Sequence, residues 1–571
     1  MVDSDGNWDY HLRILSASAR DSTVSDPALL ESVKKLTELC KAEKSDDLAA
    51  RVYPYMNKLF QRLIASIPQS SSSGGLLLLA ILQFFLDFGE TVLHDADPSL
   101  RAFFRSCLSR EFADPVIAEA TVEFLIRNRK KLHTSFPTLL PQFFPLLLKL
   151  IAWNGEKLEK SFMKIFPALV APGSFLPLFP ALVDLPVLVV ALEKVGRSCG
   201  PLVGSSIASI KSSRAPEMLL ALMDEAYTGS TIADGEGDSE SEDSSAIDIS
   251  DPVFLDLLKD ENDGIAERHI TSPAIAAAIQ AAIGGPQSDR LKQSLKIAPN
   301  LLDIYFAIAM RDVNDSLICA LIPMLMSRNA ALFSDKIYSY EVRKRLLEFM
   351  LASFQRSADF IALLKKPIMD RLGEAYDSLE KTELALQLCW AIGEHGGGGE
   401  SHKDAARELF ESLELLVYEN LSSSRLGLRQ QPGLSFSRTS SMSASGAGSE
   451  RPSQSRLLCF VVTAIAKLAA WHRELLPRAR VSLAKVARSQ SSDARVWTRA
   501  RDWLNLLNEP AISISVLRSS RNSSGEKSYP GSVNWSDGGS KMIAHIPFYL
   551  LAGQPGPPFH DFAFSDILPR R

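Results

Sequence analysis

Along most of the chain, apolar residues recur three or four positions apart, the spacing that places them on one face of an α-helix. Runs of alternating apolar and polar residues, which would indicate strands, are almost absent. Examples of the helical spacing are Val33, Leu36, Leu39 and Cys40, then Leu346, Phe349, Met350 and Phe354, and later Leu409, Phe410, Leu413, Leu416 and Val417. The pattern therefore predicts an all-α protein.

Several of these helices have a recognisable start. A carboxylate that can cap a helix precedes a proline, which fits the first helical position, at Asp26-Pro27, Asp97-Pro98, Asp114-Pro115 and Asp251-Pro252. The connectors between the apolar faces are short and polar. Many helices joined by brief turns are typical of an extended HEAT- or armadillo-like α-solenoid, in which each helix pair packs on its neighbours.

Changes in composition divide the predicted array. We expect N-terminal helices over 1–65, a flexible connector over 66–75, solenoid over 76–232 and 252–420, and basic C-terminal helices over 456–510. The intervening segments are predicted to be disordered. They are an acidic loop over 233–251, a Ser/Arg-rich loop over 421–455 and a mostly irregular C-terminal tail over 511–571.

Three apolar runs could be mistaken for membrane spans: Leu76 to Phe88, Leu139 to Trp153, and Ser174 to Leu192. The first is too short to cross a bilayer core of about 30 Å as a helix. The other two contain several prolines and a charged residue, and prolines interrupt helices rather than extend them. We expect all three runs to form buried core helices, without a transmembrane segment.

Composition adds limits on function. The 571 residues carry a net charge of −5, so no overall field favours nucleic acid or an anionic membrane. The six cysteines are isolated, without metal-ligand spacing, which suits a reducing compartment. The first residues are polar and acidic and do not resemble a signal peptide. These features favour a cytoplasmic protein.

No motif for catalysis, cofactor binding or metal binding is present. The histidines form no HExxH pair, and there is no phosphate-binding GxxxxGK[ST] loop or GxSxG elbow. The glycine run Gly396 to Gly399 follows a predicted helix, which indicates a turn and not a phosphate cradle. We expect a non-enzymatic protein without a cofactor, although catalytic groups can converge from distant positions.

The most informative polar feature is a basic stretch from Lys467 to Arg501, with nine basic residues opposed by Glu474 and Asp493. An apolar set (Leu475, Leu476, Val481, Leu483 and Val486) predicts that these helices pack while the arginines face outward. The candidate surface for an acidic partner or anionic headgroups comprises Arg473, Arg478, Arg480, Lys485, Arg488, Arg495 and Arg499. A solvated helix face is the plainer alternative.

Two further features are weaker. Ser239, Ser241, Ser437, Thr439 and Ser440 lie in the predicted loops, where phosphate would add charge to mobile chain. The segment Leu255-Asp256-Leu257-Leu258 is similar to a short coat-binding leucine motif, although an ordinary helix start explains it as well.

Certain strings go beyond a generic solenoid. They occur in this order: Phe136-Pro137 to Asn154, Phe166-Pro167-Ala168-Leu169-Val170, Phe179-Pro180-Ala181-Leu182-Val183-Asp184-Leu185-Pro186, Trp390-Ala391-Ile392-Gly393-Glu394, Leu409-Phe410-Glu411-Ser412-Leu413-Glu414, Thr463-Ala464-Ile465-Ala466-Lys467-Leu468-Ala469 and Leu475-Leu476-Pro477-Arg478-Ala479. Their collinear order resembles the zeta subunit family of the fifth adaptor-protein complex, from about residue 76 to 510. The strings are structural in character, so no functional residue is transferred from the family.

The resemblance implies a large scaffold chain in a heterotetramer with beta, mu and sigma chains. It also implies peripheral association with late-endosomal or lysosome-related membranes, together with large helical scaffold proteins. This chain departs from the family because Pro68 to Gly75 joins regions that are farther apart in other members. Helices of the family's N-terminal half are therefore expected to be missing, which puts assembly with a small subunit in doubt.

Two other functions remain open from the sequence. One is a HEAT-type scaffold of another assembly, nuclear or nucleic-acid associated, which would use the basic stretch from Lys467 to Arg501. Nucleic acid is the less favoured partner because the tryptophans there suit a helix core as well as a stacking platform. The other is an enzyme with a dispersed site, which no motif supports.

Overall fold

The computed structural model describes helices and short connections, and no strand occurs among its described residues. These are residues 3–20, 26–43, 46–67, 74–199, 204, 207, 257–263, 279–282, 287–357, 359–397, 402–429, 447–489 and 493–509. They belong to two compact units. Unit 1 comprises Met1–Arg311 with Phe333–Ser339, and unit 2 comprises Asp312–Leu332 with Tyr340–Arg571. The predicted all-α fold is confirmed.

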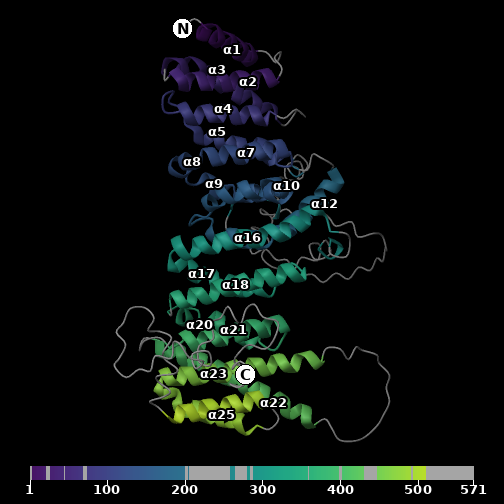
Figure 1. Ribbon diagram of the computed structural model, residues 1–571, viewed down its shortest axis with the longest axis vertical. Helices are drawn as coiled ribbons and strands as arrows, with labels where there is room; N and C mark the ends of the chain where they lie inside the picture. Colours follow the sequence, from purple (N-terminus) through teal and green to yellow (C-terminus); the bar gives the residue numbers. More distant parts are fainter. Residues whose placement is uncertain are drawn as a thin grey trace, which may run out of the picture. The chain divides into compact units, whose positions relative to one another are not determined.

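Unit 1 is a stack of helices that lie one above another across the view of Figure 1. Its α-helices are α1 (Asp3–Arg20), α2 (Asp26–Glu43), α3 (Asp46–Ser66), α4 (Gly75–Phe88), α5 (Ala96–Ala102), α6 (Ser109–Glu111), α7 (Pro115–Arg127), α8 (Arg129–Ser135), α9 (Leu139–Gln142), α10 (Phe144–Ile165), α11 (Phe175–Val183), α12 (Leu185–Cys199) and α16 (Asp289–Asp312). A π-helical turn, η1 (Phe103–Leu108), joins α5 to α6, and a 3₁₀ turn, η2 (Phe166–Leu169), follows α10.

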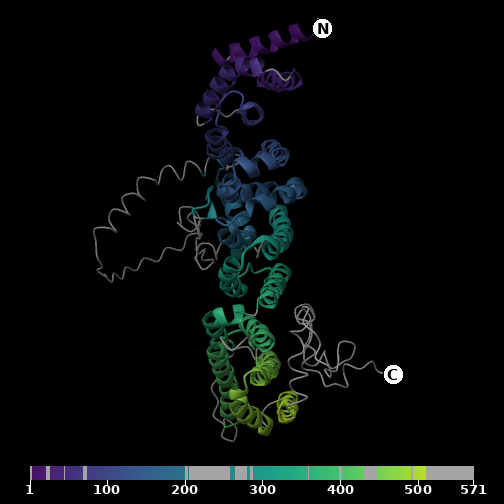
Figure 2. The same ribbon diagram turned by 90° about the vertical axis from the view of Figure 1, so that its left-hand side faces the viewer.

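Unit 2, taken by itself, is also built of stacked helices (Figure 1). Its helices are α17 (Asp315–Asn329), α18 (Lys336–Arg356, which begins in unit 1), α19 (Asp359–Leu363), α20 (Lys365–Gly373), α21 (Leu379–His395), α22 (Lys403–Arg429), α23 (Ala447–Trp471), η5 (Arg473–Leu475), α24 (Leu476–Arg488) and α25 (Ala494–Asn508). Helices such as α16, which run across Figure 1, are seen nearly end-on in Figure 2.

Contacts between helices follow the chain order in both units. In unit 1, α1 packs on α2 and α3, and further contacts link α4 to α7, α7 to α10 and α10 to α12. In unit 2, α21 and α22 both pack on α23, which also packs on α25. Contacts of each helix with its next two or three neighbours are typical of a helical repeat array, so the predicted solenoid is confirmed.

The predicted helix starts are partly confirmed. The Asp114 side chain accepts hydrogen bonds from the backbone of Val116 and Ile117, with Pro115 at the start of α7. α2 begins at Asp26. The prediction at Asp97-Pro98 is wrong by two residues, because Asp95 is the cap and accepts a hydrogen bond from the Asp97 backbone nitrogen. Asp251-Pro252 lies outside the described residues.

The apolar runs form core helices, as expected. Leu77 to Leu86 of α4 is almost entirely buried, and so are α9, the first half of α10, α11 and α12. α11 and α12 bend by 67° at the break around Asp184. Within unit 2, the window Gln454–Trp471 of α23 is long and apolar enough to span a membrane, and 78% of it is buried inside the protein.

Some predicted boundaries differ from the structure. The predicted loop over 421–455 is too long, because α22 extends to Arg429 and α23 begins at Ala447. The missed helical ends are rich in Ser, Gly and Arg, whose polarity hides the helical spacing. Residues 430–446, the acidic segment 233–251, most of the connector (68–73) and the tail from 510 lie outside the described residues.

Aromatic rings close unit 1 around α16. Tyr305 of α16 stacks on Phe175 of α11 at 5.0 Å between ring centroids, and its hydroxyl donates to the Phe175 carbonyl at 2.8 Å. Tyr338 is also buried, and its hydroxyl donates to the Val183 carbonyl at 2.7 Å. Buried tyrosines thus hold α16 and the start of α18 against α11, from which both are separated by more than a hundred residues of sequence.

Candidate interaction surface

The basic stretch folds as η5, α24 and α25, which pack on one another and on α23 in unit 2. α24 buries Ala479, Leu483 and Val486, at helical spacing. Val481, which we expected on the buried face, is 55% exposed. The expected packing of the stretch is confirmed, but its apolar face does not include Val481, because Val481 is two residues from Leu483 and therefore points to the opposite side of the helix.

Arg478 is bound within the protein. Its guanidinium contacts Glu411 Oε1 at 2.9 Å and Glu414 Oε2 at 2.5 Å, both on α22, and lies over the Phe410 ring. Ser482, one turn along α24, donates to the other oxygen of Glu414 at 2.5 Å. These contacts raise the pKa of Arg478, with the Glu411 hydrogen bond as the largest cause. Arg478 therefore holds α24 on α22.

The next turn of α24 continues this contact. Lys485 Nζ lies 4.5 Å from the centroid of the Tyr418 ring and 3.3 Å from its hydroxyl. The same hydroxyl is 3.2 Å from Ser482 Oγ. Residues 478, 482 and 485 share one helical face, so this side of α24 lies along α22. Arg478 and Lys485, two of the seven residues predicted to bind a partner, therefore contact α22 inside unit 2.

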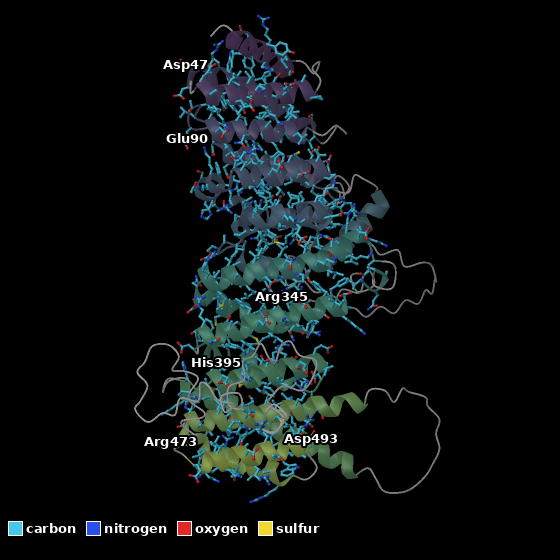
Figure 3. All side chains as sticks on the ribbon, viewed as in Figure 1. Asp47, Glu90, Arg345, His395, Arg473 and Asp493 are labelled. Carbon is cyan, nitrogen blue, oxygen red and sulfur yellow. The ribbon has the colours of Figure 1, made fainter. Side chains whose placement is uncertain are left out.

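The other predicted residues differ in their surroundings. Arg495 forms an ion pair of 2.8 Å with Asp493 at the start of α25, and this pair lowers the pKa of Asp493. Arg480 reaches the Leu507 carbonyl at 3.4 Å. Arg499 is half-buried on α25, while Arg473 in η5 and Arg488 at the end of α24 are exposed. In Figure 3, Arg473 and Asp493, which flank α24 in sequence, lie on opposite sides of the helix stack.

Lys467, which we counted in the basic stretch, does not belong to an exposed surface. Its side chain is 2% exposed and its ammonium is paired with Glu394, whose side chain is 4% exposed. A Cβ atom added at Gly393 would lie 3.3 Å from Cα of Ala464, so the absence of a side chain lets α21 and α23 approach closely. The Trp-Ala-Ile-Gly-Glu string thus meets the Thr-Ala-Ile-Ala-Lys-Leu-Ala string in the core.

The leucine pair of the predicted coat-binding motif is not available for docking in this structure. Leu257 is 5% exposed and Leu258 is 1% exposed, and both pack in unit 1. The buried Lys149 of α10 donates to the Leu258 carbonyl and pairs with Asp260 at 2.7 Å. This cluster was not predicted from the sequence. Its signal was a lysine inside the apolar run Leu139 to Trp153, a position at which a charge requires a buried partner.

The described residues show no arrangement suited to catalysis. No three of their His, Cys, Asp and Glu side chains could together hold a metal ion. Burial raises the pKa of the Cys107 and Cys389 thiols well above the usual value and that of Cys40 to about 11, which favours the unreactive protonated form. Gly396 ends α21 and Gly397 packs on the Trp471 ring, as expected for a turn between helices. The five predicted phosphorylation residues lie outside the described part of the chain.

Comparison with known proteins gives two matching family models. One, described as "AP-5 complex subunit, vesicle trafficking", matches residues 24–149. The other, described as "AP-5 complex subunit zeta-1, C-terminal TPR repeats", matches residues 280–532 and so covers α16 to α25. The described parts of both matched regions consist of helices and their connections, and TPR repeats are helix pairs of the kind seen in unit 2.

Two curated proteins align with most of the chain. The AP-5 complex subunit zeta-1 of Mus musculus is 24% identical over 536 residues, and that of Homo sapiens is 24% identical over 535 residues. Each alignment covers 89% of this chain and 58% of the relative, so the chain spans little more than half the length of these proteins. Together with the two family models, these alignments show that the chain belongs to the AP-5 complex subunit zeta-1 family.

Proposed function

We propose that this chain is a non-enzymatic scaffold subunit of an AP-5-type adaptor complex that acts in vesicle-mediated transport. The observation that carries the proposal is the family membership, because one matching family model is described as a vesicle-trafficking subunit. The fold is compatible with this role. A stack of helices presents a long series of inter-helix surfaces and needs no catalytic site to hold other proteins.

The proposed partners are a beta, a mu and a sigma chain of the same complex, together with large helical scaffold proteins. The proposed location is peripheral, on late-endosomal or lysosome-related membranes. The alignment covers only 58% of the length of these relatives, so the partners and the location must be tested with this chain itself. If the expected loss of N-terminal helices is real, binding of the small chains is the most demanding part of the proposal.

The test is affinity purification of the tagged chain from its own cells, followed by mass spectrometry of partners in stoichiometric amount. Recovery of a beta-like, a mu-like and a sigma-like chain together supports the proposal. Recovery of the beta-like chain without the small chains would mean that this chain assembles only with the other large subunit. Recovery of none of the three would contradict the adaptor function, although the helical fold would still stand.

Part of the basic stretch remains our candidate for a partner or membrane surface. Arg473, Arg480 and Arg488 are exposed on or beside α24, and no carboxylate is recorded against any of the three in the described structure. A charge reversal of all three should remove at least one partner, or membrane recruitment, from the purification above. A reversal of exposed Arg127 on α7 in unit 1 is the control and should remove none.

A further inference from the structure

A short segment, residues 257–263, is bound on unit 1 in the manner of a peptide ligand. The described chain begins at Leu257 and ends at Asp263 in this region, with undescribed residues on both sides. Leu257 and Leu258 are buried, and the acidic residues Asp260, Glu261 and Asp263 follow them. We name the surface that holds this segment the cradle and define it by Arg105, Ser109, Gln142 and Lys149.

The cradle binds two of the three carboxylates of the segment, those of Asp260 and Glu261. Lys149 Nζ lies 2.7 Å from Asp260 Oδ1, and Ser109 Oγ donates to Asp260 Oδ2 at 3.3 Å. Arg105 binds Glu261 with two hydrogen bonds, of 2.6 and 2.9 Å, and Gln142 Nε2 donates to the same carboxylate at 2.6 Å. Bidentate pairing of this kind fits the two oxygens of a carboxylate and makes the contact stronger and more specific in geometry than a single hydrogen bond. The Arg105 hydrogen bond is also the largest cause of the lowered pKa of Glu261.

The cradle also binds the backbone of the segment. Phe143 interrupts the helical conformation between α9 and α10, so backbone groups at these two helix ends have no hydrogen-bond partner inside their own helices. The Leu146 nitrogen in the first turn of α10 donates to the Asp260 carbonyl at 3.3 Å. The carbonyl of Gln142, the last residue of α9, accepts from the Asn262 nitrogen at 2.7 Å. The helix break therefore supplies main-chain hydrogen-bonding partners for the backbone of the bound segment.

The buried charge of Lys149 makes the cradle favour an acidic segment. Its side chain is 1% exposed on a helix whose neighbouring residues are apolar and buried. Without Asp260 and the Leu258 carbonyl this ammonium would lose two of its buried partners, which is strongly unfavourable. At the rim, Arg105 is 53% exposed and Glu261 is 33% exposed, so an incoming peptide can reach this ion pair first.

We propose that the cradle is a recognition site for peptides of the pattern Leu-Leu-x-Asp-Glu-Asn, that residues 257–263 are its built-in occupant, and that a partner segment of the same pattern displaces them. The tethered segment has an effective concentration in the millimolar range or below, so it suppresses but does not prevent binding of a second peptide. The site is independent of the adaptor function and of the basic stretch in unit 2.

The experiment uses the full chain and a labelled synthetic peptide of residues 253–264. In the variant Asp260→Asn/Glu261→Gln the built-in occupant lacks both carboxylates. This variant should bind the peptide about tenfold or more tightly than the unaltered chain, because its occupant competes less well. A peptide with the same two substitutions should bind the variant about tenfold or more weakly.

A cradle substitution gives the second arm. Added to that variant, Arg105→Gln removes the exposed bidentate contact and should abolish tight binding of the peptide. Arg127→Gln, an exposed arginine on α7 with the same change of charge, should leave it unchanged. If the doubly substituted segment prevents folding, as judged by helical circular dichroism, the single variant Glu261→Gln replaces it, since Lys149 then keeps Asp260.

The proposal is overturned if a folded variant binds the peptide no better than the unaltered chain. It is overturned equally if Arg105→Gln and Arg127→Gln behave alike, or if the neutral peptide binds as well as the acidic one. The last result would indicate apolar adsorption rather than recognition of the carboxylates.

Discussion

At the scale of single residues, each unit contains a buried lysine whose pairing affects the stability of its core. Lys149 in unit 1 and Lys467 in unit 2 are each 1% exposed, and each lies against a carboxylate. Desolvation of such a pair costs about as much as its attraction returns, so its net contribution to stability is small. Loss of one member is far worse, because the other remains buried and charged. This asymmetry can be measured.

We expect Lys467→Met to destabilise unit 2 by about 3–5 kcal/mol, since Glu394 is left charged and buried. The double variant Lys467→Met/Glu394→Met should recover most of that loss, because no buried charge remains. Chemical denaturation followed by circular dichroism measures both. Lys366→Met, at an exposed lysine of α20, is the control and should change the free energy of unfolding by less than about 0.5 kcal/mol. A double variant as unstable as the single one would contradict this interpretation.

His94 makes the stability of unit 1 depend on pH. Burial lowers the pKa of its imidazole, which lies against the Phe85 ring, with Tyr53 Oη 3.1 Å from Nδ1 and Ser99 Oγ 3.2 Å from Nε2. The unfolded chain therefore binds a proton more readily than the folded one. Stability from this group is fully present above about pH 6.5 and is lost as the pH falls through the lowered folded pKa.

We predict that His94→Gln reduces the fall in melting temperature between about pH 7.5 and about pH 5.5. His133→Gln, at an exposed histidine of α8, serves as the comparison and should leave the fall unchanged. Thermal unfolding at a series of pH values measures the effect. The same fall in the His94 variant as in the unaltered chain would show that other groups cause the pH dependence.

At the scale of elements, the contact between α22 and α24 shows how two predicted strings meet. The string Leu-Phe-Glu-Ser-Leu-Glu supplies Glu411 and Glu414, and the string Leu-Leu-Pro-Arg-Ala supplies Arg478, which binds both. Glu414 is shielded from water, with a side chain 10% exposed. An arginine that the sequence suggested for an external partner therefore stabilises a helix contact.

We expect Arg478→Gln to destabilise the end of unit 2 by about 1–3 kcal/mol, because Glu414 keeps Ser482 but loses its charged partner. Arg488→Gln, on the same helix but without a carboxylate partner among the described residues, should change stability by less than about 0.5 kcal/mol. Denaturant midpoints of the two variants measure the difference. Equal midpoints would mean that Arg478 acts as a surface charge, as the sequence alone suggested.

At the scale of the whole molecule, unit 1 is closed by contacts that bridge a long interval of sequence. Tyr305 and Tyr338 bind carbonyls of α11, and the segment 257–263 binds the cradle. We therefore expect the stability of unit 1 to depend on these bridging contacts.

We predict that a flexible Gly/Ser linker of equal length in place of residues 213–250 leaves the melting temperature of unit 1 within about 2 °C, because the loop-closure entropy is unchanged. Tyr305→Phe in the same background should lower it, since the Phe175 carbonyl loses its donor. A calorimetric scan measures both. A linker variant without a cooperative transition would show that the replaced residues are part of the fold.

The sequence by itself determined the all-α class, the stacking of many helices, the core position of the apolar runs and the family. These properties follow from local spacing of apolar residues and from collinear strings, which are visible along the chain. The sequence did not determine which charged side chains remain available to an external partner. Lys467 and Arg478 are distinguishable from Arg488 only by the carboxylates that α21 and α22 bring to them. Nor did it reveal the cradle, because Lys149 and Asp260 meet across more than a hundred residues. Pairing between distant residues depends on packing, and packing is decided by the tertiary structure.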